Sequence, residues 1–206
     1  MIPWSQIKEY REQIHQRYPS IWSLKLIKRP SRLIKELVSP GMHVLDVGAG
    51  DRRLEKRIKG FCQNVVYKSM DVDRGFPHDY YSLDEIKEQF DLILLLEVLE
   101  HLKLEEGLGM LDRLKDLIKD GGRLIISIPN SFHPNEYWRN VDHKTLYSYE
   151  DLGAILLSKG FEVKGIYRAY NAPFIQLYLR LYFLSLLHKI LSIDFAKSIV
   201  FLAEKG

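Results

Sequence analysis

The sequence predicts an α/β fold built on a doubly wound, mostly parallel sheet, and three stretches carry this prediction. Residues 43–47 form a short, largely apolar run that is typical of a buried strand. Gly48 and Gly50 follow, where glycine lets the chain turn sharply and approach a ligand, and helical spacing resumes at Leu54. Residues 90–96 are continuously apolar, as in strands that are covered on both faces. Strand, glycine turn and helix in this order are typical of the start of a nucleotide-binding domain.

A length of 206 residues favours a single domain over residues 1–206, and a hydrophobic content of 46% excludes a disordered chain. The net charge is only +3. Lysine and arginine are mixed with aspartate and glutamate, which argues against a nucleic-acid partner. The single cysteine, Cys62, excludes an intramolecular disulfide and a cysteine zinc cluster. The first residues lack the basic-then-apolar pattern of a signal peptide, so we expect a cytoplasmic protein, with association at a membrane surface as the alternative.

Residues 1–41 are predicted to form an N-terminal helical arm. Apolar residues at three- and four-residue steps indicate a helix that ends near Pro19, and a second helix is expected with Ser31 as its N-cap. The pair either packs on the sheet or forms a lid that turns Trp4 or Tyr10 toward a substrate. A basic cluster in this arm is expected to be a solvated face, or to contact an acidic substrate or membrane headgroups, and it consists of Lys25, Lys28, Arg29, Arg32 and Lys35.

Residues 42–130 are predicted to form a cofactor-binding half. Its second strand carries Asp71 at its end, where such folds place an acid that accepts hydrogen bonds from ribose hydroxyls. Asp73 is the second choice for this role, or it caps the following turn. Asp79 and Tyr80 lie in a polar, aromatic segment, where a carboxylate could bind an adenine amino group while a ring stacks on the base.

Polar residues also follow the apolar run of residues 90–96. Residues 97–102 read Glu-Val-Leu-Glu-His-Leu and would lie at the carboxyl end of a central strand, where ligands bind in such sheets. A helix is expected over residues 105–119, a break at residues 120–122 and another buried strand over residues 123–130.

Together these motifs resemble those of class I S-adenosylmethionine-dependent methyltransferases. The matching stretches are residues 44–50, Asp71, residues 90–102, residues 121–130, residues 149–152 and residues 159–163. The Glu-Val-Leu-Glu-His-Leu string is similar to the branch that methylates small molecules, which includes ubiquinone-type O-methyltransferases. The resemblance implies a Rossmann-like, seven-stranded sheet whose last strand is antiparallel. It also implies S-adenosyl-L-methionine as cofactor and a small-molecule, lipid-linked or sugar acceptor for the methyl group.

The resemblance further implies which residues hold the cofactor, from its methionine end through the ribose to the adenine. This set is Asp46, Gly48, Ala49, Gly50, Asp71, Val72, Asp79, Tyr80 and, near the sulfonium, Glu97. One position departs from the family, because members usually have a third glycine where this chain has Arg52. The arginine side chain would either crowd the cofactor or fold outward over it.

Three other functions stay open from the sequence. Arg52 prompts the alternative of a non-catalytic, cofactor-binding partner protein. An NAD-type dehydrogenase is disfavoured because the glycine pattern lacks the glycine that packs the helix on the strand. An RNA methyltransferase is disfavoured by the scattered charge and by the absence of an Asn-Pro-Pro-Tyr-type string.

Residues 131–206 are predicted to form the acceptor half, with a polar, aromatic loop over residues 131–140 as one wall of the pocket. If the acceptor is a hydroxyl group, a base must take its proton, and an imidazole titrates near neutral pH. His143 and His133 are the candidate catalytic residues, and His101 is expected to be mainly structural. No metal-ligand spacing is visible, so no metal site is predicted.

The stretch of residues 174–191 is strongly apolar and belongs to a helical insertion over about residues 172–193. Its length approaches that of a membrane span, but Gln176, Arg180, His188 and Lys189 argue against one. It is expected to cover the sheet and pocket, to form a homodimer face, or to dock on a membrane that carries a lipid-linked acceptor.

Overall fold

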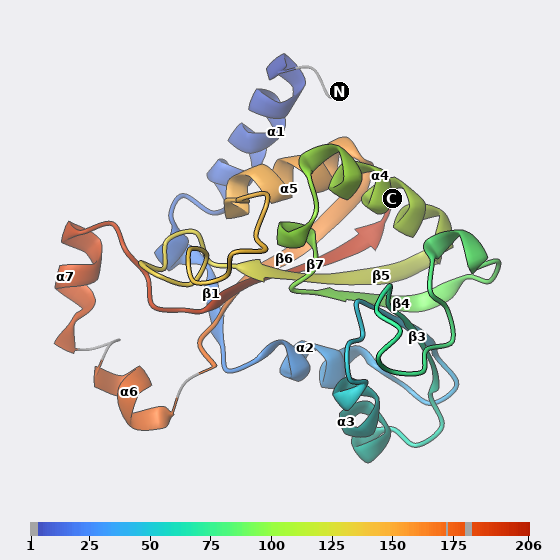
Figure 1. Ribbon diagram of the computed structural model, residues 1–206. Helices are drawn as coiled ribbons and strands as arrows, with labels where there is room; N and C mark the ends of the chain where they lie inside the picture. The colour runs from blue at the N-terminus through green and yellow to red at the C-terminus, as the bar shows by residue number, and fades with distance from the viewer. Residues whose placement is uncertain (1–3, 172, 180–182) are drawn as a thin grey trace.

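The computed structural model describes residues 4–171, 173–179 and 183–206 (Figure 1). The strands are β1 (Lys25–Ile27), β2 (His43–Val47), β3 (Val66–Met70), β4 (Phe90–Leu96), β5 (Ile118–Pro129), β6 (Phe161–Ala169) and β7 (Ser198–Lys205). The α-helices are α1 (Trp4–Arg17), α2 (Pro30–Leu37), α3 (Arg53–Phe61), α4 (Leu104–Leu117), α5 (Tyr149–Ser158), α6 (Phe174–Tyr178) and α7 (Ser185–Ile190). Short 3₁₀ helices include η2 (Leu83–Glu85) and η3 (Leu99–His101).

The strands form one seven-stranded sheet in the order β1-β6-β7-β5-β4-β2-β3. Neighbouring strands run parallel except β7, which is antiparallel to both β5 and β6. Figure 1 shows α4 and α5 over one face of the sheet and α2 and α3 over the other. The doubly wound, mostly parallel sheet with an antiparallel last strand is therefore confirmed.

Two apolar layers, one on each face, hold the sheet between the helices. Along β2, Val44 enters the layer beneath α2 and α3, whereas Leu45 enters the layer beneath α4 and α5. Leu94 and Leu95 divide in the same way along β4, and all four side chains are buried. Since successive side chains of a strand point to opposite faces, burial on both faces explains the continuous apolar runs of the sequence.

The N-terminal arm packs on the sheet assembly, as one of the two predicted alternatives requires. Helix α1 lies against α5, where Ile14 fills the space beside Gly153. A Cβ added to Gly153 would lie 2.9 Å from Cγ1 of Ile14. Arg11 and Asp151 form an ion pair of 3.3 Å across the same contact. Tyr10 is half-buried on this helix, and the side chain of Trp4 lies outside the described residues. We therefore infer a packing role for α1.

Two details of this arm differ from the sequence prediction. Helix α2 begins at Pro30 with Arg29 as its N-cap, so the assignment of Ser31 as N-cap was wrong. Proline is well suited to the first helical position because its fixed φ matches the helix and its missing N–H would have no partner there. Lys25 of the basic cluster lies in β1, which pairs with β6 at the edge of the sheet. The arm is thus not purely helical.

The expected break at residues 120–122 also differs, because β5 already begins at Ile118 and continues through both glycines. Gly121 has a φ of +70°, which L side chains rarely adopt. A Cβ on Gly122 would lie 2.8 Å from the carbonyl oxygen of Lys119 and 3.1 Å from that of Phe90. The glycines therefore allow an irregularity between β4 and β5 while the ladder continues.

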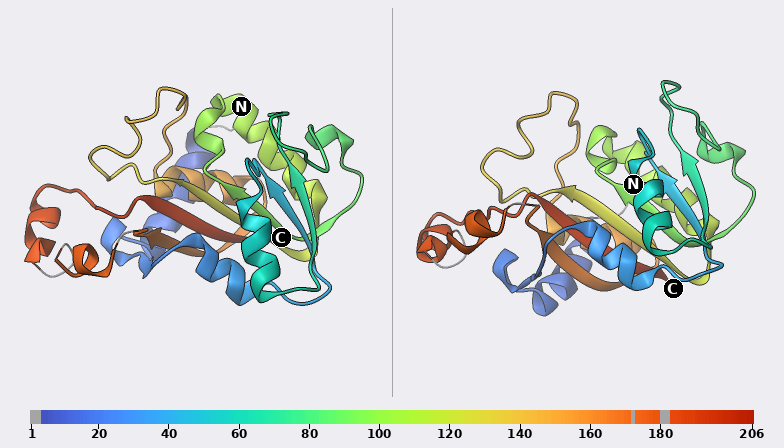
Figure 2. Two further views of the ribbon diagram at one scale, coloured as in Figure 1. Left: turned by 60° about the horizontal axis from the view of Figure 1, so that its bottom comes forward. Right: turned by 90° about the horizontal axis from the view of Figure 1, so that it is seen from below.

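The apolar insertion forms two short helices, α6 and α7, that stand away from the sheet (Figures 1 and 2). We call residues 173–179 and 183–193 the C-terminal lobe. No helix among the described residues combines the length and apolarity needed to cross a bilayer. The lobe returns to the sheet at Asp194, whose carboxylate accepts hydrogen bonds from Arg168 at 3.0 Å and from Asn130 at 2.9 Å.

Candidate functional site

The turn after β2 brings the backbone close to the end of β4. Gly48 has a φ of +76°, and an added Cβ would collide with Cγ2 of Val98. The N–H groups of Gly48 and Ala49 both donate to the carbonyl oxygen of Met70, at 2.9 and 3.2 Å. Gly50, also left-handed at +51°, opens onto free space. Glycine is therefore required at position 48, and the turn is fixed to the end of β3.

Asp71 lies directly after β3 and holds this turn from the other side. Its Oδ2 accepts a hydrogen bond from the Gly50 N–H at 2.8 Å, and its Oδ1 accepts from the Asp73 N–H at 2.9 Å. Each carboxylate oxygen has a second lone pair, so the side chain can still accept from two further hydroxyl groups. Val72, next to it, is exposed to solvent. This geometry suits a carboxylate that binds a diol beside the glycine turn.

Asp79 and Tyr80 fix the loop that follows. Oδ2 of Asp79 accepts from the N–H of Ser69 at 3.0 Å, and Oδ1 accepts from Nζ of Lys68 at 3.2 Å. Partial burial opposes ionisation of Asp79, but these hydrogen bonds outweigh it and lower its pKa. The backbone of Tyr80 forms an isolated parallel β-bridge with Met70, and the Tyr80 hydroxyl donates a hydrogen bond to Glu88. The predicted contact of both residues with adenine stays a prediction.

Arg52 follows the glycine turn, and its side chain bonds to groups of α3 and of the loop after β3. Its backbone is left-handed, with a φ of +57°, which explains why glycine is common at this position. Its Nε donates to Glu55 at 2.9 Å, and its Nη1 donates to the carbonyl oxygen of Pro77 at 2.9 Å. Nη2 lies 3.6 Å from Asp79. The side chain therefore ties the glycine turn to the loop over residues 77–80.

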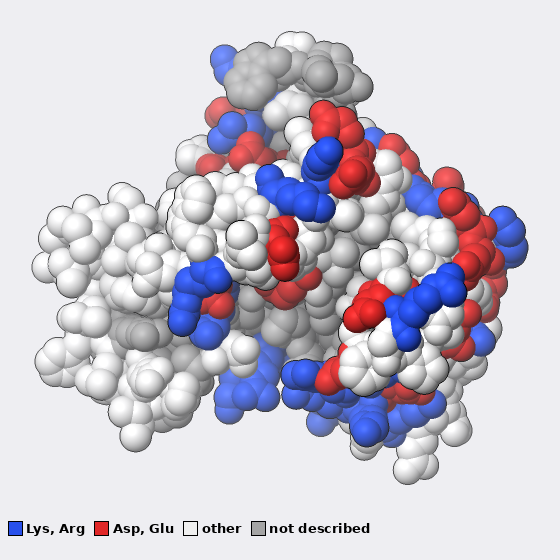
Figure 3. Space-filling view, in the orientation of Figure 1, with Lys and Arg blue, Asp and Glu red and all other residues white. Residues whose placement is uncertain are grey.

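A cavity of about 370 Å³ opens at the carboxyl ends of β4, β5 and β6 and at the amino end of the antiparallel β7. Its basic side chains are Arg29, Arg53 and Arg57, and its polar side chains include Glu97 and Ser127. Figure 3 shows this edge of the sheet as a hollow with acidic groups at its sides and basic groups below it. Cations on one wall and a carboxylate on another suit a zwitterionic ligand such as an amino-acid moiety.

Asp46 lies beneath the glycine turn rather than in the lining of this cavity. It is buried, and its Oδ2 accepts a hydrogen bond from the Tyr67 hydroxyl at 2.5 Å. Burial raises the pKa of Asp46 to about 7, since the hydrogen bond from Tyr67 lowers it less and the charge of Asp71 raises it further. The predicted contact of Asp46 with the methionine end of a cofactor stays a prediction.

This buried carboxyl predicts a pH-dependent stability. Because the pKa of Asp46 is raised from 3.8 to about 7 by folding, its stabilising protonated form is fully present below pH 3.8 and is lost as the pH rises through 7. Asp46→Asn should therefore match the wild type near pH 4 and exceed its free energy of unfolding by roughly 2 to 4 kcal/mol at pH 8. Urea unfolding of the cofactor-free protein at both pH values measures this, and a pH-independent difference would contradict it.

A second group of polar side chains follows β4 at the same edge of the sheet. Glu100 and His101 end η3, and the loop before α5 brings His143 to them, so that ligand atoms of the three residues lie within 4.8 Å of one another. Glu100 is only 1% exposed, and neither of its carboxylate oxygens has a hydrogen-bond partner among the described residues. Burial and the charge of the nearby Glu97 raise the pKa of Glu100 to about 8.

A contact at Nδ1 fixes the orientation of the His143 ring. Its Nδ1 lies 2.7 Å from the carbonyl oxygen of Tyr137 and donates to it when it carries the proton, which leaves the lone pair on Nε2. The rings of His143 and His101 meet edge to face with centroids 5.0 Å apart. Two imidazoles and a buried carboxylate form a donor set that divalent transition-metal ions prefer. The second contact at Nδ1 is typical of histidine ligands in proteins.

Glu97 links this group to the cavity. Its backbone is left-handed, with a φ of +56°, a strained conformation that is common at functional sites. Its Oε1 accepts a hydrogen bond from the Ser127 hydroxyl at 2.7 Å. The surrounding protein raises the pKa of Glu97 by desolvation, although hydrogen bonds from Ser127 and Ser198 oppose this.

His133 occupies a different place from His143. Its Nδ1 accepts from the Asn135 N–H at 3.2 Å, and its ring packs edge to face on Phe195 with centroids 5.6 Å apart. It is not a member of the group formed by Glu100, His101 and His143. Sequence reasoning missed this group because no local spacing relates position 143 to positions 100 and 101, and only the fold brings them together.

Comparison with known proteins agrees with this geometry. A family model described as a methyltransferase domain matches residues 14–164. A comparison with curated sequences gave no match.

Several solved structures share the fold at low sequence identity. A SAM-dependent methyltransferase from Archaeoglobus fulgidus is 17% identical, with 95% of this chain and 94% of that chain covered and a TM-score of 0.66. Magnesium protoporphyrin IX methyltransferase (ChlM) from Synechocystis PCC 6803 with bound SAH is 15% identical, with 100% and 89% covered and a TM-score of 0.59. N-methyltransferase NodS from Bradyrhizobium japonicum WM9 is 11% identical, with 85% and 93% covered and a TM-score of 0.57.

Proposed function

The chain belongs to the methyltransferase domain family, within the class I S-adenosylmethionine-dependent methyltransferases. We propose that it methylates a hydroxyl group of a small-molecule, lipid-linked or sugar acceptor. One observation carries the choice of a hydroxyl acceptor. The group of Glu100, His101 and His143 lies beside Glu97, which lines the cavity, so groups that handle a proton or hold a cation adjoin the cavity.

The crevice fits S-adenosyl-L-methionine in three respects. The cavity of about 370 Å³ offers Arg29, Arg53 and Arg57 to a carboxylate and Glu97 to an ammonium group. The turn at Gly48 lets the backbone approach a ligand, and Asp71 can accept from two ribose hydroxyls. When bound, the cofactor supplies a methyl group on a positively charged sulfur, which needs no further activation.

The protein's own contribution is alignment and control of the acceptor proton. Holding donor and acceptor in line removes an entropic barrier worth several kcal/mol, roughly 7 to 11 in the best intramolecular cases. A hydroxyl group must also lose its proton for methyl transfer. A cation held by Glu100, His101 and His143 would lower the pKa of such a hydroxyl. Without a cation, the Nε2 lone pair of His143 would accept the proton, since Nδ1 is directed at the Tyr137 carbonyl oxygen.

The sequence alternative of a non-catalytic partner protein rested on Arg52. Its side chain is engaged with Glu55, Pro77 and Asp79 and does not line the cavity of about 370 Å³, which supports a catalytic protein over this alternative. Transfer of a labelled methyl group from S-adenosyl-L-methionine to a panel of phenols, lipid-linked alcohols and sugars tests the proposal. Labelling of at least one class, abolished by S-adenosylhomocysteine, is the expected result. Binding of the cofactor without transfer to amine or hydroxyl acceptors would support the partner-protein alternative.

A metal ion should bind and stabilise the protein through Glu100. Zn²⁺ or Co²⁺ should bind as a single equivalent, because the ion satisfies carboxylate oxygens that otherwise have no partner. At a free concentration about one hundred times the Kd, the free energy of unfolding should rise by about 2.7 kcal/mol. Equilibrium dialysis and thermal unfolding with added metal or EDTA measure both effects.

Two variants make the metal test specific. Glu100→Gln should abolish metal uptake and the stabilisation, whereas His133→Ala should retain both because His133 lies outside the group. Equal metal uptake by the wild type and Glu100→Gln, or no uptake by either, would exclude the site.

A further inference from the structure

The C-terminal lobe turns its apolar side chains to solvent. On α7, Leu186 and Ile190 are 70% and 69% exposed, and Phe183, just before this helix, is 80% exposed. Further exposed apolar side chains of the lobe are Ile175, Tyr178, Leu179, Leu184, Leu187 and Leu191. Soluble surfaces rarely carry an apolar patch of this kind unless it serves an interaction. We propose that the lobe docks this protein on the surface of an anionic lipid bilayer.

The orientation of α7 supports an outward-facing role. Leu186, Leu187, Ile190 and Leu191 recur at the spacing of one helix face, and all four are exposed. His188 points the other way: it is 4% exposed and packs on Phe195, with ring centroids 4.8 Å apart. A helix that covers a core would place its leucines inward, whereas here the polar residue faces the protein. The apolar face of α7 is therefore exposed and available for binding to a lipid bilayer.

The charge around the lobe fits anionic headgroups. The sequence from position 171 to position 193 contains no aspartate or glutamate, and its charged residues include the exposed Lys189. In Figure 3 the lobe is white over the visible face, and the charge at its border is mainly blue. An apolar helix face beside lysine and arginine is the composition of helices that lie in the headgroup region of membranes.

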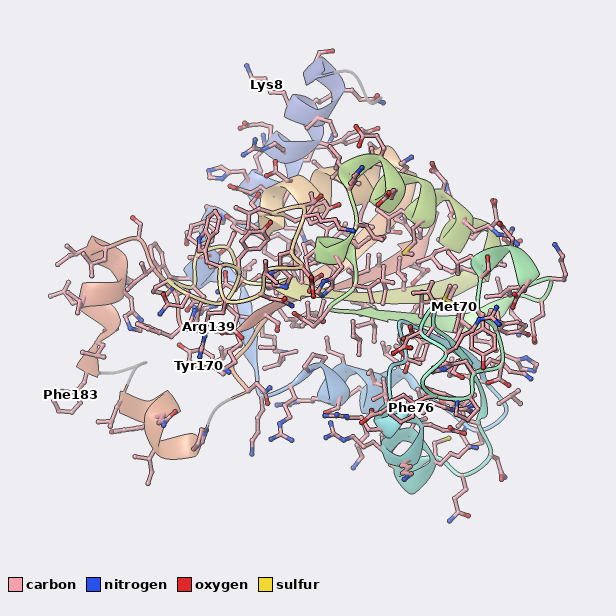
Figure 4. The ribbon with its side chains drawn as sticks, viewed as in Figure 1. Lys8, Met70, Phe76, Arg139, Tyr170 and Phe183 are labelled. Carbon is pink, nitrogen blue, oxygen red and sulfur yellow. The ribbon has the colours of Figure 1, made fainter. Side chains whose placement is uncertain are left out.

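A second segment extends the same surface. In the loop between β5 and α5, Trp138 and Val141 are 76% and 95% exposed, and the exposed charged residues beside them are Arg139, Asp142 and Lys144. Figure 4 places Arg139 on the side of the molecule that faces the lobe, with Phe183 at the lobe's outer end. Tryptophan is enriched at membrane–water interfaces, where its ring is apolar and its N–H stays hydrated.

Hydrogen bonds join the two segments at their bases. The Asp194 N–H donates to the carbonyl oxygen of Phe132 at 2.9 Å, and Phe195 packs on His133. The lobe is therefore built onto the loop that carries His143. If the proposed function holds, a lipid-linked or lipophilic acceptor would reach the site along this surface without leaving the bilayer.

Charge also favours a bilayer over a second copy of this chain. A two-fold interface would bring identical surfaces together, so the basic border of each lobe would meet the basic border of the other. An anionic bilayer neutralises this border and buries the apolar face at the same time. A dimer is therefore the outcome that the experiment must be able to reveal.

Vesicle sedimentation with the full chain tests the proposal. Vesicles of phosphatidylcholine with about one third phosphatidylglycerol should bind the protein several-fold more tightly than pure phosphatidylcholine, and salt should reduce this preference. The double variant Leu186→Glu and Ile190→Glu should weaken binding to both vesicles by roughly tenfold or more, because it charges the apolar face. Leu104→Glu, which changes an exposed leucine of α4 outside the lobe, should bind as the wild type does.

Further measurements separate docking from loss of fold and from failure of the proposed function. Both variants should retain the wild-type melting temperature and affinity for S-adenosylhomocysteine, since neither change touches the crevice. Vesicle binding needs no acceptor, so it can succeed even if methyl transfer is absent. Absence of vesicle binding by the folded wild type would overturn the proposal. A wild-type dimer in light scattering that the double variant converts to monomer, without vesicle binding, would instead assign the lobe to self-association.

Discussion

Replacing His143 by alanine should lower the turnover number by about 10²- to 10⁴-fold, the range that removal of proton-transfer catalysis spans. The Nε2 lone pair of His143 lies with Glu100 and His101 at the edge of the crevice, so its loss affects the acceptor and not the donor. The affinity for S-adenosylhomocysteine should stay unchanged. Steady-state methyl transfer and calorimetric titration of the same preparations measure the two quantities.

His133→Ala is the matched control for this substitution. Its ring packs on Phe195 and its Nδ1 accepts from the Asn135 N–H, so we expect a loss of less than about tenfold in turnover. Unchanged turnover in His143→Ala would remove His143 from the acceptor site. A larger loss in His133→Ala than in His143→Ala would assign the role of base to His133, the second catalytic candidate of the sequence.

Asp194→Ala should lower the free energy of unfolding by about 3 to 5 kcal/mol, the cost of leaving one partner of a buried ion pair alone. The Asp194 carboxylate is 1% exposed and pairs with Arg168 at 3.0 Å, and it also accepts from Asn130 at 2.9 Å. The guanidinium of Arg168 would keep its bonds to the carbonyl oxygens of Leu24 and Trp22. The melting temperature should fall by about 10 °C or more in a chain of this size.

An exposed pair provides the control for this prediction. Arg32 and Glu36 form an i,i+4 ion pair of 3.0 Å with side chains 64% and 57% exposed. Glu36→Ala should change the free energy of unfolding by less than about 0.5 kcal/mol because solvent screens the pair. Urea unfolding compares both variants, and similar losses in the two would show that burial does not set the strength of the Arg168–Asp194 pair.

The cofactor half follows from the sequence because its signals are local. The apolar runs predict β2 and β4, and the glycines at positions 48 and 50 do take the left-handed conformations that a sharp turn needs. In the acceptor half, the cap of α5 is equally local, since the hydroxyl oxygen of Ser148 accepts from the Asp151 N–H. Each of these features depends on residues within a few positions of one another, which periodicity and turn chemistry detect.

Other features depend on contacts between distant parts of the chain. Strand β1 has three residues in a basic segment, and only its pairing with β6 makes it a strand. The group of Glu100, His101 and His143 forms when the loop after β5 folds back on η3, through N–H groups of Lys144 and Thr145 that donate to the Glu100 carbonyl oxygen. No pattern in the sequence relates these positions, so the meeting of these three side chains could not be predicted from spacing.

Arg52 shows how a departure from a family pattern is accommodated. The position requires a left-handed backbone, which costs a non-glycine residue about 1 to 2 kcal/mol. The side chain offsets this cost through its bonds to Glu55 and to the Pro77 carbonyl oxygen, both of which lie outside the cavity. The sequence could raise the question of crowding, but the direction of the side chain depends on the loop over residues 77–80.

Calorimetric titration of S-adenosylhomocysteine into the full chain tests the central claim, that the crevice beside Gly48 and Asp71 binds the adenosyl cofactor. We expect one molecule bound per chain, and binding weaker by about tenfold to a hundredfold in Asp71→Ala, because the ribose loses hydrogen bonds to a charged acceptor. NAD under the same conditions should give no heat of binding. A folded wild-type protein that takes up no S-adenosylhomocysteine at millimolar concentration, or binds NAD instead, would contradict the account.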